Sequence, residues 1–344
     1  MICKCTNLFS NQTIIAIFAG DMDAREQICM PIKVEFDEFQ NRYSSLFSCS
    51  NPAVDVLLKF LSRRNGKLMR PILVLLVSKC YGQIPDSAYH LAAAVELLHQ
   101  GSLIHDDVVD ESDKRRGRRS ANAAFDNRIA VLLGDYIVSM ALQQITATGD
   151  VRSIDNLSTL IGTLSEGEIN QLNALNDTTL SEEVYFDIIS KKTAILFSSC
   201  TSLSALLSGA SEADVEAFRQ FGHVAGLCFQ IMDDILDYHD SGETGKPSGN
   251  DLKEGKFTLP AIYALNHSDR DWTGHIKAIR SLEATPEQIR EVTDYSVFNG
   301  GIEYAVAKMD ELKKQAIQGL PASISPELRN SFVSYLELIT HRAK

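Results

Sequence analysis

Two segments of the sequence carry three aspartates each at the same spacing, and each segment ends a long stretch with helical apolar periodicity. They are Asp106-Asp107-Val108-Val109-Asp110 and Asp233-Asp234-Ile235-Leu236-Asp237. On a helix, Asp106 and Asp110 are neighbours, and their carboxylates repel unless a cation lies between them. Such oxygen ligands suit Mg²⁺, which takes one or two carboxylates and completes its shell with water and substrate phosphate. The pair of segments therefore predicts a magnesium site for a phosphorylated substrate, against the alternative of two solvated helix ends.

Two basic clusters accompany the acidic segments. They are Gly66-Lys67-Leu68-Met69-Arg70-Pro71, at the junction of two helix patterns, and Lys114-Arg115-Arg116-Gly117-Arg118-Arg119, directly after the first acidic segment. Arginine matches diphosphate oxygens with two parallel hydrogen bonds, and lysine supplies a point charge. Beside metal-binding acids the clusters predict a diphosphate pocket, although either one alone is equally typical of a solvated basic turn.

Helices must position these residues, because helix signals follow one another from about residue 50 onward and strand signals are nearly absent. Helix starts, several with a capping-box acid or an early proline, are predicted at Ser50, Asp86, Thr179, Ser211, Thr285 and Ser325. Apolar periodicity without proline covers 86–110, 123–148, 181–208 and 211–238. The sequence predicts an all-α fold, a single large helical bundle. The polar stretch 239–255 is predicted to be a functional loop.

Composition bounds the function and the location. The 344 residues include 45 acidic and 33 basic ones, for a net charge of −12, which argues against nucleic-acid binding. The seven cysteines form no Cys-x-x-Cys pair and are odd in number, as is typical of reduced thiols in a cytoplasmic protein. No run approaches the roughly 20 apolar residues of a membrane span. We therefore expect a cytoplasmic protein without a transmembrane segment.

The N-terminal stretch 1–29 carries no core pattern. Its apolar run 14–19 is shorter than the roughly 7–15 residues of a signal sequence. We expect either a disordered extension or a start assigned too early, with Met30 the true first residue. Because no Ser/Gly/Pro-rich linker divides the chain after residue 50, residues 30–344 are predicted to form one domain.

The motifs and their order resemble those of trans-polyprenyl diphosphate synthases, closest to the medium- and long-chain members. The two aspartate-rich regions match in the segments 96–117 and 229–238. Between and after them lie the further matching pieces Gly66-Lys67-Leu68-Met69-Arg70-Pro71, Glu166-Gly167-Glu168 with Gln171, Lys192-Thr193-Ala194, Gly245-Lys246-Pro247 and 251–260. The resemblance covers about residues 45–344 and implies a bundle of the isoprenoid synthase type with a central active-site cavity.

The resemblance also implies roles for individual residues. Asp106, Asp110 and Asp233 would hold Mg²⁺, with Mn²⁺ as a substitute, against the allylic diphosphate, while Asp237 would be a further ligand and Asp107 and Asp234 would support them. Arg115, Lys192 and Lys256 would contact that diphosphate, with Lys246 nearby. Lys67, Arg70, His99 and Arg116 would bind isopentenyl diphosphate, and Thr193 and Gln230 would line the reacting centre. The two partners implied are thus isopentenyl diphosphate and an allylic diphosphate.

Product length is predicted from the residues one turn before Asp106. Gly101 and Ser102 are small where farnesyl-type enzymes place an aromatic floor, which favours a product longer than farnesyl. The alternative is that small residues there permit close helix packing. A deeper floor from the 131–145 helix, where Tyr136 and Met140 share a face, stays open. The apolar stretch 123–148 and the resemblance together lead us to expect a homodimer.

Other functions fit the sequence less well. A terpene cyclase would not need Lys67, Arg70 and Arg116 for a second diphosphate, and a di-iron bundle needs paired Glu-x-x-His motifs where only Glu96-x-x-His99 exists. A short-chain farnesyl or geranylgeranyl synthase and a non-catalytic subunit of a heteromeric synthase remain as alternatives. The segment Arg118-Arg119-Ser120 departs from the usual pattern, in a turn rather than at a proposed ligand.

Overall fold

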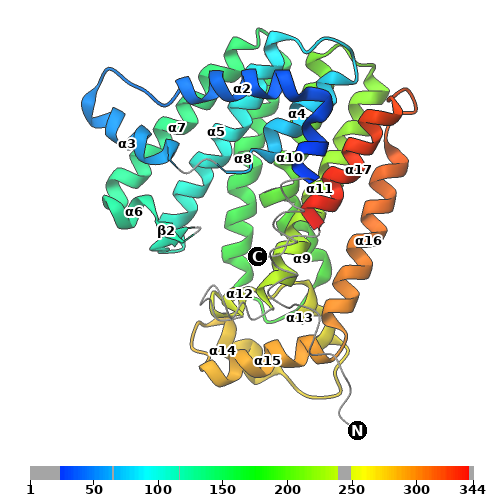
Figure 1. Ribbon diagram of the computed structural model, residues 1–344. Coiled ribbons are helices and arrows are strands. Elements are labelled where there is room, and N and C mark those ends of the chain that lie inside the picture. Colours follow the sequence, from blue (N-terminus) through cyan, green and yellow to red (C-terminus); the bar gives the residue numbers. More distant parts are fainter. Residues whose placement is uncertain (1–23, 64–65, 116, 239–248, 341–344) are drawn as a thin grey trace, which may run out of the picture.

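The computed structural model describes residues 24–63, 66–115, 117–238 and 249–340, and these are almost wholly helical (Figure 1). The elements are η1 (Met30–Ile32), α2 (Lys33–Ser45), α3 (Pro52–Ser62), α4 (Met69–Lys79), α5 (Asp86–Val109), β1 (Lys114–Arg115), β2 (Arg118–Arg119), α6 (Ala121–Ala124), α7 (Asn127–Ala147), α8 (Val151–Ala174), α9 (Glu182–Ile189), the π-helix η2 (Ser190–Ala194), α10 (Ile195–Leu207), α11 (Glu212–Asp237), α12 (Asn250–Lys253), α13 (Leu259–Asn266), α14 (Thr273–Arg280), α15 (Pro286–Phe298), α16 (Gly301–Gly319) and α17 (Pro326–Thr340). The predicted all-α class is confirmed.

Local capping chemistry explains where the helices begin. The predicted starts at Asp86, Ser211, Thr285 and Ser325 are confirmed. Two others shift by one or two residues, because Asn51 rather than Ser50 caps α3 and Ser181 rather than Thr179 caps α9. At α3, α9, α11 and α15 a side chain that accepts from a free N–H group of the first turn sets the boundary, whereas α5 begins after Pro85 without a side-chain cap.

The long central helices pack directly on one another. Helix α5 lies against α7 and α4, α10 lies against α11 and α4, and α8 contacts both α7 and α10. Gly226 allows the close approach of α11 to the start of α10, because a Cβ there would lie 2.5 Å from the Cα of Ala194. Figure 1 shows α16 and α17 beside α11, while α12 to α15 gather at one end of the bundle. Helices α5 and α11, which carry the two acidic segments at their C-termini, are thus held in one core.

The N-terminal boundary differs from the prediction. Residues 24–29 are helical, and the Ile28 side chain has 0% exposure in the same apolar cluster as α4 and α5. The predicted limit at residue 29 is therefore too late, because this turn contributes to the core. Residues 1–23, where the predicted extension also falls, lie outside the described residues.

Helix α7 is the one helix in the described parts of the chain that is long and apolar enough to cross a membrane, and 39% of its apolar window is buried. Core helices of soluble proteins meet the same criteria, so length and composition alone decide nothing about α7.

Candidate active site

The first acidic segment divides its aspartates between two directions. Asp107 is only 4% exposed and accepts a hydrogen bond from Arg115 Nε at 2.7 Å. Asp110, one turn after Asp106, lies 3.5 Å from the ammonium nitrogen of Lys256. Asp106 and Asp110 thus share one helix face, while Asp107 holds Arg115, which explains why the sequence needs an acid at each position.

In the second segment, Asp234 is the buried member. Its Oδ2 accepts a hydrogen bond from the Tyr185 hydroxyl at 2.6 Å, and its Oδ1 accepts one from Gln230 Nε2 at 2.8 Å. Gln230 in turn accepts a hydrogen bond from Thr193 Oγ1 at 2.7 Å. Asp233 is exposed. The predicted residues Thr193, Gln230 and Asp234 therefore form one connected chain of hydrogen bonds.

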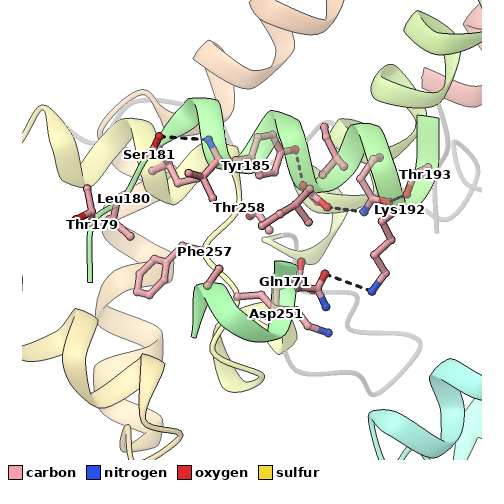
Figure 2. A pocket seen from close by; sticks show the side chains of 18 of the residues that line it. Gln171, Thr179, Leu180, Ser181, Tyr185, Lys192, Thr193, Asp251, Phe257 and Thr258 are labelled. Carbon is pink, nitrogen blue, oxygen red and sulfur yellow. Dashed lines mark hydrogen bonds between the residues drawn. The ribbon is translucent and has the colours of Figure 1, made fainter. Parts of the chain in front are cut away.

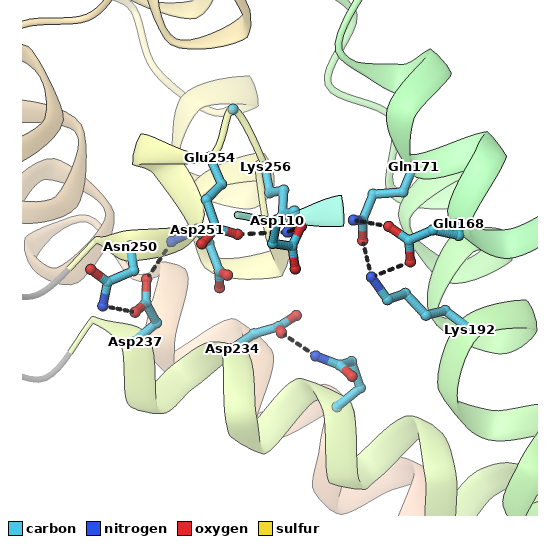
Figure 3. Close-up of polar contacts among 12 residues, drawn as sticks. Asp110, Glu168, Gln171, Lys192, Asp234, Asp237, Asn250, Asp251, Glu254 and Lys256 are labelled. Atoms are coloured by element: carbon cyan, nitrogen blue, oxygen red, sulfur yellow. Dashed lines mark hydrogen bonds and ion pairs between the residues drawn. The ribbon is translucent and has the colours of Figure 1, made fainter. Parts of the chain in front are cut away.

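Asp237 has a structural task that the sequence did not indicate. Its two carboxylate oxygens accept hydrogen bonds from the Asn250 side chain at 3.2 Å and the Asp251 N–H at 3.0 Å (Figure 3). Asp237 is 8% exposed. It thereby joins the end of α11 to the start of α12, and its predicted role as a metal ligand stays a prediction.

Lys192 lies in the π-helical turn between α9 and α10, a helix type that is frequent at functional sites. Its ammonium nitrogen lies 2.5 Å from Glu168 Oε2 and donates to Gln171 Oε1 at 3.3 Å. Gly167 permits this arrangement, because a Cβ there would lie 2.9 Å from the Lys192 backbone nitrogen. Figure 3 shows Lys192, Asp110 with Lys256, and Asp234 directed toward a common space from separate elements.

A cavity of about 160 Å³ opens beside this space (Figure 2). Its lining includes Lys192, Thr193, Gln230, Asp234 and Lys256. Five of the predicted site residues are therefore brought together from η2, α11 and the segment between α12 and α13.

A second cavity, of about 300 Å³, is lined by His99, Asp107 and Arg115, together with Gly66 next to Lys67. Arg63 and Arg118 line it as well, so the departing segment after Gly117 faces a cavity and is more than a remote turn. Arg115 was predicted for the allylic diphosphate, yet it shares this cavity with His99, which was predicted for isopentenyl diphosphate. The hydrogen bond to Asp107 is what turns Arg115 there.

The other predicted basic residues have mixed outcomes. Arg70 is 9% exposed, with its guanidinium carbon 4.7 Å from the ring centroid of Phe197. Leu68, between Lys67 and Arg70, adopts φ +51°, a strained conformation for a leucine of the kind found at binding sites. Lys67 is exposed. Arg116 and Lys246 lie outside the described residues, so their roles stay predictions.

Burial changes the protonation of the acids that face the common space. Burial, opposed by Lys192, raises the pKa of Asp106 from its usual 3.8 to about 6. Burial, opposed by hydrogen bonds from Tyr185 and Gln230, raises the pKa of Asp234 to about 7. Burial and the neighbouring carboxylates of Asp234 and Asp237 raise the pKa of Asp251 well above its usual range. These acids lack enough positive charge around them, as expected for a site built to receive a cation.

These pKa values predict that stability depends on pH and on metal. Because the folded state holds protons on Asp106 and Asp234 that the unfolded state releases near pH 3.8, unfolding free energy falls as pH rises through about 4 to 7. In EDTA we expect these two groups to lower the unfolding free energy by about 2–4 kcal/mol between pH 5 and pH 8. Thermal denaturation at the two pH values measures this difference.

Mg²⁺ with pyrophosphate should restore the midpoint temperature at pH 8 more than at pH 5. The Asp234→Asn variant removes one of the titrating groups, so its pH dependence in EDTA should be flatter. A pH dependence equal to that of the original chain would contradict the assignment.

The two residues predicted to set chain length lie on different faces of α5. A Cβ at Gly101 would lie 2.9 Å from Val138 Cγ2, so Gly101 faces α7 and permits close packing, the alternative that the sequence left open. Ser102 lies about 40° from Asp106 around the helix, whereas Gly101 lies about 140° away. Ser102 therefore shares the Asp106 face.

Sequence reasoning missed three functional contacts. Tyr185 was not selected, although it lies about two helical turns before Lys192 and lines the same cavity. Asp251 and Glu168 stood in matched motifs without an assigned role. Their contacts with Asp237 and Lys192 come from other helices, so spacing along the chain could not reveal them.

The donor set fits magnesium held jointly by protein and substrate. Among the residues described, no group of three or more His, Cys, Asp or Glu side chains is close enough to hold a metal alone. Mg²⁺ commonly takes one or two carboxylates and fills its shell with phosphate and water, so a few carboxylates on separate helices suffice. The predicted donors are the pair Asp106 and Asp110 at the end of α5 and the exposed Asp233 on α11.

A helical core that presents two aspartate-rich helix ends, with lysines between them and a separate arginine-lined cavity, defines the class of helical isoprenoid synthases. The sequence matches the polyprenyl synthetase family over residues 51–296. The chain belongs to this family, as the resemblance predicted, and it is a prenyltransferase.

Individual relatives agree with this assignment. Octaprenyl diphosphate synthase of Escherichia coli (strain K12) is 33% identical over 278 residues, covering 80% of this chain and 86% of that protein. The structure of geranylgeranyl pyrophosphate synthase from Bacteroides thetaiotaomicron is 38% identical with a TM-score of 0.81, covering 93% of this chain and 100% of that one. A polyprenyl synthase from Caulobacter crescentus CB15, complexed with calcium and isoprenyl diphosphate, has a TM-score of 0.85 at 29% identity, covering 93% and 98%.

Proposed function

We propose that this prenyltransferase adds isopentenyl diphosphate to an allylic diphosphate, with Mg²⁺, to give an all-trans polyprenyl diphosphate longer than farnesyl. One observation carries the proposal: the described residues line two separate cavities, each with its own cations, and each cavity is linked to the first acidic segment, one through Lys256 next to Asp110 and the other through Asp107. Lys192 and Lys256 line one, and Arg115 with His99 lines the other. A terpene cyclase binds one diphosphate substrate and has no need for a second cavity lined by cations.

The residues divide the chemistry between them. Lys192 and Lys256 would neutralise the diphosphate of the allylic substrate as its C–O bond breaks. Mg²⁺, when bound by Asp106, Asp110 and Asp233, would add charge neutralisation to the same leaving group. The Thr193–Gln230–Asp234 chain fixes polar atoms beside the carbocation. The double bond of isopentenyl diphosphate then attacks, and loss of a proton yields the longer allylic diphosphate.

Proton loss needs an acceptor, and the departing diphosphate can serve. His99, a candidate base among the described residues, lines the arginine-lined cavity and not the cavity that contains Lys192. The released diphosphate, by contrast, stays at the reacting centre between Lys192 and Lys256. No separate protein base is therefore assigned.

Product length gives a prediction at Ser102. Because Ser102 shares the face of Asp106, Ser102→Phe should place a ring across the path of the growing chain and shift the main product toward farnesyl length. Chromatography of dephosphorylated products measures the shift. The matched variant Gly101→Phe faces α7 instead, so it should lower the midpoint of thermal unfolding through its clash with Val138. If Ser102→Phe leaves product length unchanged, Ser102 does not limit the growing chain. Tyr136 and Met140 are then the next residues to test.

We also propose a homodimer formed through α7. This helix exposes several large apolar side chains, namely Val131 (41%), Leu132 (64%), Tyr136 (36%) and Leu142 (39%). A second copy covering that face would remove them from water. This use of α7 fits a cytoplasmic enzyme without a transmembrane segment.

The dimer gives a second prediction. Leu132→Glu should convert a particle of twice the chain mass into a monomer, because a buried unpaired carboxylate costs several kcal/mol at an interface. Light scattering coupled to size exclusion measures it. Phe298→Glu, at an apolar residue that is even more exposed (81%) at the end of α15, should leave the dimer intact. A monomeric original chain, or a dimer that tolerates Leu132→Glu, would contradict the proposal.

The function is tested with purified protein, Mg²⁺, radiolabelled isopentenyl diphosphate and, separately, dimethylallyl, geranyl, farnesyl and geranylgeranyl diphosphates. We expect products longer than farnesyl that disappear with EDTA. Products of farnesyl or geranylgeranyl length would favour a short-chain synthase. No incorporation with any starter would favour a non-catalytic subunit.

A further inference from the structure

Arg280 lies outside every segment that the resemblance assigned to substrate binding, at the C-terminal end of α14. Its Nη1 donates to the carbonyl oxygen of Gly255 at 3.0 Å. Its guanidinium carbon lies 5.1 Å from the ring centroid of Phe257, which is labelled in Figure 2. Arg280 therefore contacts the residue before and the residue after Lys256.

The backbone that Arg280 contacts has little freedom. Gly255 adopts φ +76°, and a Cβ there would lie 2.7 Å from Leu175 Cδ2 and 3.3 Å from the carbonyl oxygen of Ile279. The segment thus fits closely between the end of α8 and the end of α14. The Lys256 N–H donates to the Asp251 carbonyl at 2.8 Å, which fixes the other side.

Lys256 needs a fixed backbone because its own side chain is flexible. Its ammonium nitrogen lies 3.5 Å from Asp110 and 2.6 Å from Glu254, so it bridges the loop after α12 to the end of α5 (Figure 3). A small shift of the Gly255 carbonyl would move this charge away from Asp110 and from the space that Lys192 faces.

Arg280 is costly to keep at this position. Burial lowers the pKa of its guanidinium, with Asp177 opposing the shift. Its Nε is buried without a hydrogen-bond partner among the residues described. The contacts with Gly255 and Phe257 must therefore outweigh an unsatisfied donor, and arginine is the side chain that donates and stacks on an aromatic ring at once.

We propose that Arg280 is a positioning residue for the allylic diphosphate site, which holds the Lys256 ammonium in place through Gly255 and Phe257. The inference rests on the function proposed for Lys256. Arg280 itself is not assigned a contact with substrate.

The test compares Arg280→Met with Lys277→Met, an exposed lysine lost from the same helix. Calorimetric titration with inorganic pyrophosphate and Mg²⁺ should show about tenfold weaker binding for Arg280→Met and no change for Lys277→Met, as expected for losing a charge-assisted contact. In turnover, KM for the allylic diphosphate should rise about tenfold while KM for isopentenyl diphosphate stays constant. Arg280→Lys, which donates without stacking, should lie between.

A double-variant cycle separates positioning from general stability. If Arg280 acts through Lys256, Arg280→Met should weaken pyrophosphate binding less than twofold in a Lys256→Met background. Equal weakening in both backgrounds, or equal rises in both KM values, would overturn the proposal. Should Arg280→Met fail to fold, Arg280→Lys carries the same cycle. If the original chain incorporates no isopentenyl diphosphate, the proposed function is wrong. The pyrophosphate-binding measurements on the single and double variants still decide whether Arg280 acts through Lys256.

Discussion

Asp106→Asn is expected to lower kcat by about a thousandfold, the loss typical of removing a preorganised electrostatic contact to developing charge. Asp106 and Asp110 share the helix face that meets Lys256, so asparagine would leave a single carboxylate there to hold the metal. The same change should not destabilise the protein without metal. Because burial raises the pKa of Asp106 to about 6, its charge costs folding free energy at pH 8, and the neutral amide removes that cost.

The prediction is specific because Asp106→Asn should lower kcat while it raises the unfolding free energy of the metal-free protein at pH 8. Incorporation of labelled isopentenyl diphosphate measures the first, and thermal denaturation in EDTA at pH 8 measures the second. Asp155→Asn, an exposed aspartate on α8, is the control and should change neither. An Asp106→Asn protein that is inactive because it is unfolded would remove the support for a metal-binding role.

Lys192→Met is expected to lower kcat/KM for the allylic diphosphate by about a hundredfold. The ammonium group faces Asp234 across the common space, and two side chains of α8, Glu168 and Gln171, hold it there. Loss of the charge removes a cation from the diphosphate and also leaves Glu168 without its partner. Binding of inorganic pyrophosphate should weaken in parallel.

The adjacent lysine supplies a closely matched control. Lys191 is 27% exposed against 26% for Lys192, yet it pairs with Glu166 and Asp187 instead. Lys191→Met should therefore keep kcat/KM within about twofold, since exposed pairs contribute little. Similar losses in both variants would mean that the π-helical turn, and not the Lys192 charge, supports activity.

The helical fold and the chemistry of the site could be predicted from the sequence. Aspartates at i and i+4 share a face wherever a helix forms, and capping residues such as Ser211 act within three positions of themselves. These interactions are local, so spacing alone reports them. Positions of the lysines in matched motifs followed from the resemblance.

Other features depend on helices that meet only in the folded chain. The carboxyl of Asp234 is oriented by Tyr185 of α9, and Asp237 is engaged by the start of α12. Gly101 faces α7 rather than a substrate path. Each of these roles is set by which helix packs opposite, and no periodicity within one segment carries that information.

The N-terminal turn shows the same division. Nothing in the pattern of residues 24–29 marked them as core, yet Ile28 is fully buried against the bundle. The sequence by itself determined that acidic helix ends and basic clusters would exist, because side-chain type and helical spacing are local properties. Only the tertiary structure decided which acid meets which base, since Asp107 with Arg115, Asp110 with Lys256 and Lys192 with Glu168 all depend on how separate segments pack together.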